Sequence, residues 1–248
     1  MKSIVKILLL ALFLALSGTE LLAVDKQGAQ QGSSMPDPAA VHGHVTALIS
    51  PAFSLNSSRT AVLIMDFQND IVGMLPEGAQ APLLEKAGAI LKASRQARMP
   101  VMYIVVRFRD GYPEVNLQNR LFSSLKESGR FREGTPGAEI HAAVAPQTGD
   151  IIVTKRRVGA FSTTDLETIL RSKNISTLVL LGISTSGVVL STVRWAADMD
   201  YKLVVVSDAC ADRDAEVHRV LMDKVFPMQA TVVDTREFLK AVGAKDEK

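Results

Sequence analysis

The sequence has 248 residues, of which 47% are hydrophobic and 22% are charged, and its formal net charge is +2 at pH 7. Charges of both signs are mixed along the chain, so the charge balance does not indicate binding to nucleic acid or to a membrane surface. A single cysteine, Cys210, excludes an intrachain disulfide. Residues 58–242 are one domain's worth of chain and are long enough to bury a core without covalent cross-links.

Residues 1–23 have the layout of a secretory signal peptide. Lysines in MKSIVK precede the apolar run ILLLALFLAL, and SGTELLA ends in small residues before Val24. The apolar run is too short to span a bilayer as a stable anchor. We therefore expect a periplasmic or secreted protein with no membrane insertion after signal removal. An uncleaved N-terminal anchor is the alternative.

Residues 24–57 are rich in Gly, Gln, Ser, Pro and Ala and have no periodicity, which is typical of a linker or a surface arm. His42 and His44 form an H-x-H pair within this arm. Two histidines alone make an incomplete metal site. We therefore expect a solvated arm, and nothing in the sequence indicates a metal or another cofactor.

Residues 58–242 alternate apolar runs typical of buried strands with helix-like patterns. The predicted strands are 60–67, 100–108, 150–155, 176–182, 201–209 and 229–235. The predicted helices are 82–99, 163–174, 186–200 and 214–226. Residues 109–136 are polar and irregular, so they are predicted to form a long loop or lid. This alternation indicates an α/β domain with a mainly parallel, six-stranded sheet covered on both faces.

Ligands of open parallel sheets bind beyond the carboxyl ends of the strands, so polar residues there are candidates for function. Asp66 lies at the end of the first predicted strand and Lys155 ends the third. In a half-buried pocket Lys155 would stabilise ionised Asp66, and the pair would move a proton to or from a substrate. The N-terminus of the 186–200 helix would offer N–H groups to an anion. An ordinary structural ion pair is the alternative.

The turn GISTSGVVLST, residues 182–192, matches none of three common strand–turn–helix motifs. It lacks the Lys of a P-loop, the middle glycine of a dinucleotide fingerprint and the second glycine of a G-x-S-x-G elbow. Ser184, Asp208 and His218 have the chain order of a serine hydrolase triad. However, His218 lies in the middle of an amphipathic helical pattern, which favours a solvated or capping histidine.

Three segments occur in one order: TAVLIMDFQND, VTKRRVGAFSTTDLETIL and LVLLGISTSGVVLSTVRWAADMDYKLVVVSDAC. They resemble the isochorismatase-like (cysteine hydrolase) superfamily over about residues 58–235. The resemblance implies a three-layer α/β/α Rossmann-like fold, hydrolysis of a small molecule, and a homo-oligomer. It places Asp66 and Lys155 at two positions of the family's Asp–Lys–Cys triad. The motif G-x-x-T-x-x-C-V falls on residues 182–189, which puts Val188 at the position of the nucleophilic cysteine.

Valine cannot form the thioester or thioimidate of the family's amidases and nitrilases. No histidine follows the first motif, so the metal site of nicotinamidases is also missing. True isochorismatases likewise lack the cysteine and use the aspartate as a general acid on a vinyl ether. The resemblance therefore implies hydrolysis of a vinyl ether, amide or imide by Asp66 and Lys155, without a covalent cysteine intermediate.

The resemblance also implies a cis peptide before Ser184 and an anion hole formed by the N–H groups of Ser184 and Val188. Gln68 and Arg107 are further candidates for substrate binding, because they lie at the ends of the first two strands. Arg107, with Arg109 and Arg156, would hold a carboxylate through paired hydrogen bonds, or would be surface charge.

Two other classes of function stay open. One is a non-catalytic binding protein that kept the fold, and the other is a hydrolase that recruits Ser184, Ser186 or Cys210 as nucleophile. Cys210 would lie off the helix N-terminus, so it would lack the pKa depression of a reactive thiol. Trp195 is expected in the core or in a contact between subunits.

Overall fold

The computed structural model describes residues 53–243. The predicted signal peptide, most of the predicted arm and the His42–His44 pair lie outside the described residues. Within residues 53–243, no helix is both long and apolar enough to cross a membrane.

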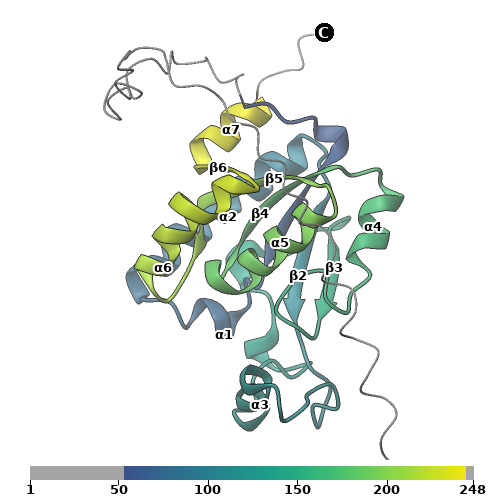
Figure 1. The fold of residues 1–248 in the computed structure, drawn as a ribbon, viewed down its shortest axis with the longest axis vertical. Helices are drawn as coiled ribbons and strands as arrows, with labels where there is room; N and C mark the ends of the chain where they lie inside the picture. Colours follow the sequence, from purple (N-terminus) through teal and green to yellow (C-terminus); the bar gives the residue numbers. More distant parts are fainter. Residues whose placement is uncertain (1–52, 244–248) are drawn as a thin grey trace, which may run out of the picture. The chain divides into compact units, whose positions relative to one another are not determined.

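Six parallel strands form one sheet in the order β3-β2-β1-β4-β5-β6 (Figure 1). Their bounds are β1 (Thr60–Met65), β2 (Val101–Val106), β3 (Ile151–Lys155), β4 (Thr177–Ile183), β5 (Lys202–Ala211) and β6 (Thr231–Val233). The predicted number of strands and the α/β/α fold are thus confirmed. The strand order reverses between β1 and β4, and the carboxyl ends of these strands are where such a sheet binds its ligand.

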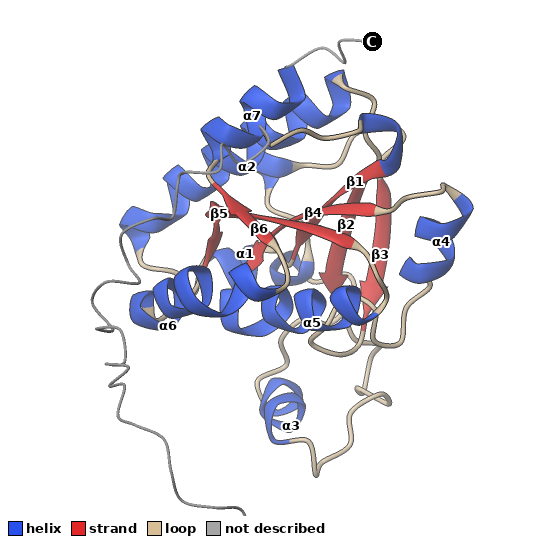
Figure 2. Ribbon diagram, turned by 45° about the horizontal axis from the view of Figure 1, so that its top comes forward, coloured by secondary structure: helices blue, strands red, loops and turns tan. Residues whose placement is uncertain are grey.

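The helices cover both faces of the sheet (Figure 2). Their bounds are α1 (Asn69–Val72), α2 (Glu77–Gln96), α3 (Arg120–Glu127), α4 (Leu166–Ser172), α5 (Leu190–Asp198), α6 (Ala215–Val220) and α7 (Thr235–Gly243). One apolar cluster joins the sheet to α2 and α7, and a second joins it to α4 and α5. Alternate residues of β1 point to the two clusters, Val62 and Ile64 to the first and Leu63 and Met65 to the second. Burial on both faces explains why this strand is apolar throughout.

Besides the single turn α1, residues 53–243 contain two helices that were not predicted. The first, α3, lies within residues 109–136, which we call the lid segment, and extends away from the sheet (Figure 1). The second, α7, begins at Thr235, which was predicted to be the last residue of the strand 229–235. Asp234 and Glu237 each accept the other's backbone N–H, at 2.7 and 2.9 Å, and this capping box begins the helix directly after β6.

Two other boundaries differ from the prediction. Helix α2 begins at Glu77, so Pro82 lies inside the helix and does not begin it. Strand β5 continues to Ala211, because it pairs with the end of β4 again after a register shift between Leu180 and Gly182. This extension carries Cys210 into the sheet.

Candidate active site

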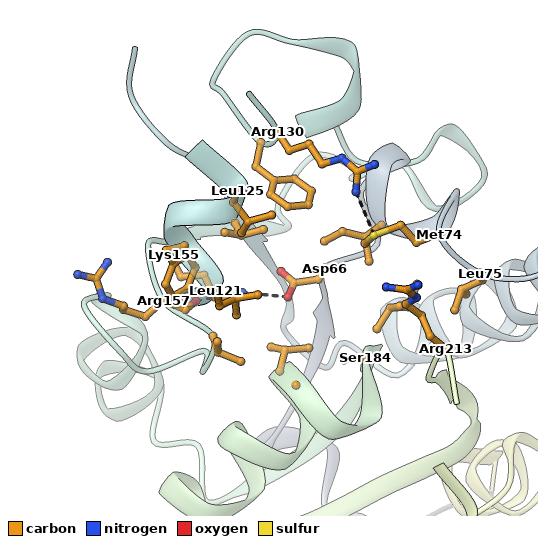
Figure 3. Close-up of a pocket in the computed structure, with 18 residues that line it drawn as sticks. Asp66, Met74, Leu75, Leu121, Leu125, Arg130, Lys155, Arg157, Ser184 and Arg213 are labelled. Atoms are coloured by element: carbon orange, nitrogen blue, oxygen red, sulfur yellow. Dashed lines mark hydrogen bonds and ion pairs between the residues drawn. The ribbon is translucent and has the colours of Figure 1, made fainter. Parts of the chain in front are cut away.

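A cavity of about 340 Å³ lies beyond the carboxyl ends of β1, β3 and β4 (Figure 3). Its walls come from α1, the lid segment and the turn after β4, and they are mostly apolar. The apolar lining residues are Ile71, Met74, Leu75, Val106, Leu121, Phe122, Leu125, Phe131, Val158, Ile183 and Val188. The polar ones are Asp66, Arg130, Lys155, Arg157, Ser184 and Arg213. The lid segment therefore closes a pocket that the sheet alone would leave open.

Asp66 and Lys155 meet on the floor of this pocket. Lys155 is the last residue of β3 and Asp66 follows β1, so the lysine side chain reaches across the end of β2. Its Nζ lies 2.9 Å from Asp66 Oδ2, and the two side chains are only 2% and 8% exposed. Lys155 Nζ also donates to the carbonyl oxygen of Arg157 at 3.2 Å. The structure thus brings together the two residues that the strand ends singled out.

The carboxyl of Asp66 has one oxygen left without a partner. Oδ2 faces Lys155, whereas Oδ1 is buried and has no hydrogen-bond partner among residues 53–243. Burial raises the pKa of this carboxyl above its usual value, although the charge and hydrogen bond of Lys155 oppose the rise. Lys155 acts on the pKa of Asp66 in the predicted direction, toward the ionised form, but the desolvation of a nearly enclosed carboxyl is the larger influence.

The backbone of Asp66 turns sharply at the end of β1. Its φ is 62°, in the left-handed region that aspartate tolerates better than most residues. Its N–H still donates to the carbonyl oxygen of Ile104 in β2 at 2.8 Å. The side chain is therefore held at the sheet edge while the chain turns into α1.

Gln68 and Arg107 do not line the pocket. Gln68 is fully buried, and its amide bonds Val106 N–H, Val106 C=O and Ala138 C=O at 2.7–2.9 Å. Arg107 binds Glu139 at 2.8 Å and also the carbonyl oxygen of Ala138. In place of the substrate contact predicted for them, both side chains bind Ala138 or Glu139, just after the lid segment.

The other two arginines predicted to hold a carboxylate are bound to acidic side chains of the protein. Arg109 lies 2.6 Å from Glu114, and Arg156 lies 3.1 Å from Glu114 and 2.6 Å from Glu133. Because Glu114 joins both arginines, they stabilise the lid segment and are not free for a ligand.

Three arginines that the sequence did not single out for substrate binding line the pocket instead: Arg130, Arg157 and Arg213. Arg157 hydrogen-bonds carbonyl oxygens and lies over the ring of Phe122. The guanidinium group of Arg130 donates to Met74 Sδ at 3.3 Å. Within residues 53–243 neither Arg130 nor Arg213 is paired with a carboxylate. Both come from loops, where no periodicity marks a residue as facing a pocket.

The turn after β4, residues 184–188, forms one wall and is called the active-site turn below. The peptide bond between Ile183 and Ser184 is cis, the position that the family resemblance implied. A π-helical segment, Thr185–Val189, follows and leads into α5. A Cβ at Gly187 would lie 2.6 Å from Ser184 Oγ, so a larger residue cannot fit there without a shift. Val188, which lines the pocket and is 2% exposed, brings no nucleophilic atom to it.

The proposed replacement nucleophiles are poorly placed. Burial raises the pKa of the Cys210 thiol to about 12, and this side chain packs in the apolar cluster beside α5. Ser186 does not line the pocket, whereas Ser184 does. Among the side-chain hydrogen bonds of residues 53–243, none joins Ser184 Oγ to a base.

Ser184, Asp208 and His218 have the chain order of a serine hydrolase triad, but the structure does not bring their side chains together as one. His218 Nδ1 lies 2.8 Å from the hydroxyl of Thr185, and Asp208 binds Lys86 and Thr235. No group of three or more His, Cys, Asp or Glu side chains in the described part of the chain is arranged to hold a metal ion.

Comparison with known proteins identifies the family. Residues 60–237 match the isochorismatase domain. The isochorismatase family protein YwoC of Bacillus subtilis is 31% identical over 76% of this chain and 97% of its own length. The ureidoacrylate amidohydrolase RutB of Stutzerimonas stutzeri is 29% identical over 78% of this chain and 82% of its own length.

A solved structure agrees with these matches. The crystal structure of a cysteine hydrolase from Pseudomonas syringae pv. phaseolicola superposes with a TM-score of 0.69 and 27% identity, over 77% of this chain and 95% of that one. Sequence and structure therefore lead to the same conclusion: the chain belongs to the isochorismatase-like superfamily of hydrolases.

Proposed function

We propose that this protein hydrolyses a small anionic molecule by general acid–base catalysis at Asp66, with Lys155 as its partner and without a covalent enzyme intermediate. The observation that carries the proposal is the unpartnered Oδ1 of Asp66, in a largely apolar pocket and beside a buried ammonium group. An oxygen in this position is free to exchange a proton with a bound substrate.

The raised pKa suits Asp66 to proton transfer, because a catalytic group works best when its pKa approaches the operating pH. With a vinyl ether, the protonated carboxyl gives its proton to the alkene carbon, and water adds to the resulting oxocarbenium ion. With an amide or imide, the carboxylate takes a proton from the attacking water and delivers it to the leaving nitrogen. In both reactions Lys155 stabilises the carboxylate while it is ionised.

The pocket favours a substrate with an apolar body and an anionic group. Arg130 and Arg213 lie on the same side of the pocket, and neither has an acidic partner within residues 53–243 (Figure 3). A guanidinium group binds a carboxylate through paired hydrogen bonds. Amides stay within the proposed class because the relative RutB is a ureidoacrylate amidohydrolase.

Two further parts of the proposal concern where and how the protein works. Residues 1–23 would direct it to the periplasm or the medium, so its substrate would be met outside the cytoplasm. Trp195 on α5 and Met199 directly after it are 50% and 38% exposed, and a homo-oligomer would cover them. Cell fractionation and sedimentation velocity test these two points.

The test of the mechanism is a panel of carboxylate-bearing vinyl ethers, amides and imides, with Asp66→Asn as the variant. General acid–base catalysis accounts for about a 100- to 10,000-fold rate enhancement, so kcat should fall by that factor. Asp208→Asn is the matched control, since Asp208 lies in β5, is also paired with a lysine and is outside the pocket. Turnover unaffected by Asp66→Asn would contradict the mechanism.

The rival functions give different results in the same assay. A recruited nucleophile would leave a covalent adduct in intact-mass spectra during turnover, and Ser184→Ala or Cys210→Ala would abolish both adduct and activity. A non-catalytic protein would bind members of the panel but leave them intact.

A further inference from the structure

The active-site turn is held from behind by the segment Asp212–His218, which follows β5. Asp212 Oδ2 accepts the backbone N–H of Ser186 at 2.7 Å. His218 Nδ1 lies 2.8 Å from the hydroxyl of Thr185. These two contacts fix consecutive residues that lie between Ser184 and Gly187, both of which line the pocket.

The His218 ring is itself held in place. Asp214 caps α6 by accepting the N–H groups of Glu216 and Val217 at 2.9 and 3.1 Å, and its carbonyl oxygen accepts the N–H of His218. His218 therefore sits one turn into a capped helix that packs against the active-site turn. Thr185 is fully buried, and His218 is the one side-chain partner of its hydroxyl among residues 53–243.

We propose that His218 is a positioning residue whose neutral imidazole fixes Thr185, and through it the wall of the pocket, so that protonation of His218 loosens the active-site turn. That a ligand binds beside this wall rests on the proposed function. The coupling between His218 and the active-site turn does not depend on it. The inference gives a role to a histidine that takes no part in proton transfer at Asp66.

The hydrogen bond itself depends on the charge of the imidazole. A neutral ring with its proton on Nε2 accepts the Thr185 hydroxyl at Nδ1. Once protonated, Nδ1 becomes a donor, and the hydroxyl proton of Thr185 loses its acceptor in a buried place. A buried donor without a partner is unfavourable, so the protonated state disfavours this arrangement of the turn.

The groups around His218 also influence the protonation of its ring. Burial is the largest influence and lowers the pKa of the ring, whereas Asp212 at the end of β5 and Asp223 in the next helical turn raise it. Arg219, on the same helix, is paired with Glu216 and Asp223. The π-helical segment Thr185–Val189 has no ionisable side chain. The net lowering of the pKa favours the neutral ring over the protonated one.

The test uses the full protein and two substitutions that keep the packing: one removes the titrating ring, and the other removes the hydroxyl that the ring binds. In His218→Asn the amide oxygen replaces Nδ1 as an acceptor that does not titrate. In Thr185→Val the hydroxyl is removed and the shape is kept. His141→Asn is the matched control, because His141 caps a short helical turn away from the pocket by accepting the N–H of Ala143.

The first readout is independent of turnover. In NMR spectra of the wild type, the Gly187 amide and the Thr185 methyl should shift in one pH transition together with the His218 ring. Both variants should lose this transition at Gly187, and His141→Asn should keep it. A Gly187 amide that is insensitive to the titration of His218 would overturn the proposal, whether or not the protein is an enzyme.

The second readout is the pH profile of kcat/KM on a substrate from the panel. The wild type should lose activity on the acid side as His218 becomes protonated, and His218→Asn should flatten that limb while activity at neutral pH is kept. His218→Leu, which cannot accept the hydroxyl, should lower kcat by about 10- to 100-fold at every pH. Equal acid limbs in wild type and His218→Asn would count against the proposal. A failed mechanism at Asp66 would instead appear as turnover that Asp66→Asn does not change.

Discussion

Two aspartates beside strand ends are each paired with a lysine, yet their surroundings differ. Asp66, beyond β1, lies 2.9 Å from Lys155, and Asp208, near the end of β5, lies 3.2 Å from Lys86. The Asp66 pair is almost completely buried, whereas the side chains of Asp208 and Lys86 are 29% and 41% exposed. Oδ1 of Asp208 accepts both the N–H and the hydroxyl of Thr235 at 2.8 Å, and Oδ1 of Asp66 accepts nothing.

The difference appears in the pKa of each carboxyl. Burial raises both, but at Asp208 the hydrogen bonds of Thr235 and the ion pair with Lys86 outweigh it, so that pKa is lowered. At Asp66 burial outweighs Lys155, and the pKa is raised. A carboxylate with complete hydrogen bonds holds structure together, whereas one with a free oxygen in a pocket is available for proton transfer.

Replacing each lysine by methionine should separate the two pairs most clearly. Lys155→Met removes the charge that stabilises ionised Asp66, so we expect kcat to fall about 100-fold or more. Lys86→Met leaves the pocket untouched and should retain wild-type kcat. Equal losses in the two variants would show that the Asp66 pair has no special part in turnover. Steady-state kinetics on one substrate from the panel measures both.

The pair of Asp208 and Lys86 should matter for the stability of the fold and not for turnover. Asp208→Ala removes two hydrogen bonds to the first residue of α7 and the contact with Lys86, so we expect a loss of about 2–3 kcal/mol in the free energy of unfolding. Thr235→Val removes one of these bonds and should cost about 1 kcal/mol. Urea unfolding at neutral pH measures both. If α7 were held mainly by its apolar face, neither variant would differ from wild type.

The smallest expected effect is a difference in the sign of the pH dependence. The folded pKa of Asp208 lies below the unfolded value, so its contribution to stability is present above that value and is lost as the pH falls through the folded pKa. The folded pKa of Asp66 lies above the unfolded value, so its contribution is present at low pH and is lost as the pH rises through the folded pKa.

Urea unfolding of wild type, Asp208→Asn and Asp66→Asn from about pH 2.5 to 8 checks these signs. With rising pH, the stability of wild type relative to Asp208→Asn should increase, and its stability relative to Asp66→Asn should decrease. Parallel curves for the two variants would refute the contrast between the aspartates.

The strands could be predicted because a parallel sheet buried on both faces needs apolar runs, and the runs of β1, β2 and β4 are apolar throughout. The meeting of Asp66 and Lys155 could be predicted for a related reason, since the carboxyl ends of parallel strands lie at one edge of the sheet and Lys155 is long enough to reach across β2. Helix α7 was missed although the capping box of Asp234 and Glu237 marks its start in the sequence.

The rest of the site depends on tertiary contacts that have no local signature. Gln68 and Arg107 are polar residues after strands, like Asp66, but their side chains bind the segment around Ala138. Arg130 and Arg213 reach the pocket because of how two loops fold over it. His218 has the spacing of a surface position on a helix, and only the packing of α6 on the active-site turn reveals its partner.

The lid segment has both of its ends tied to the same place. Phe108 donates its N–H to Phe131 and accepts the N–H of Glu133, at 2.8 and 2.9 Å, so the chain between them is a closed loop. Doubling the length of such a loop costs only about 0.6 kcal/mol of closure entropy. The length and side chains of the lid segment can therefore change at little cost to closure, while the sheet and the Asp66–Lys155 pair beneath it stay the same.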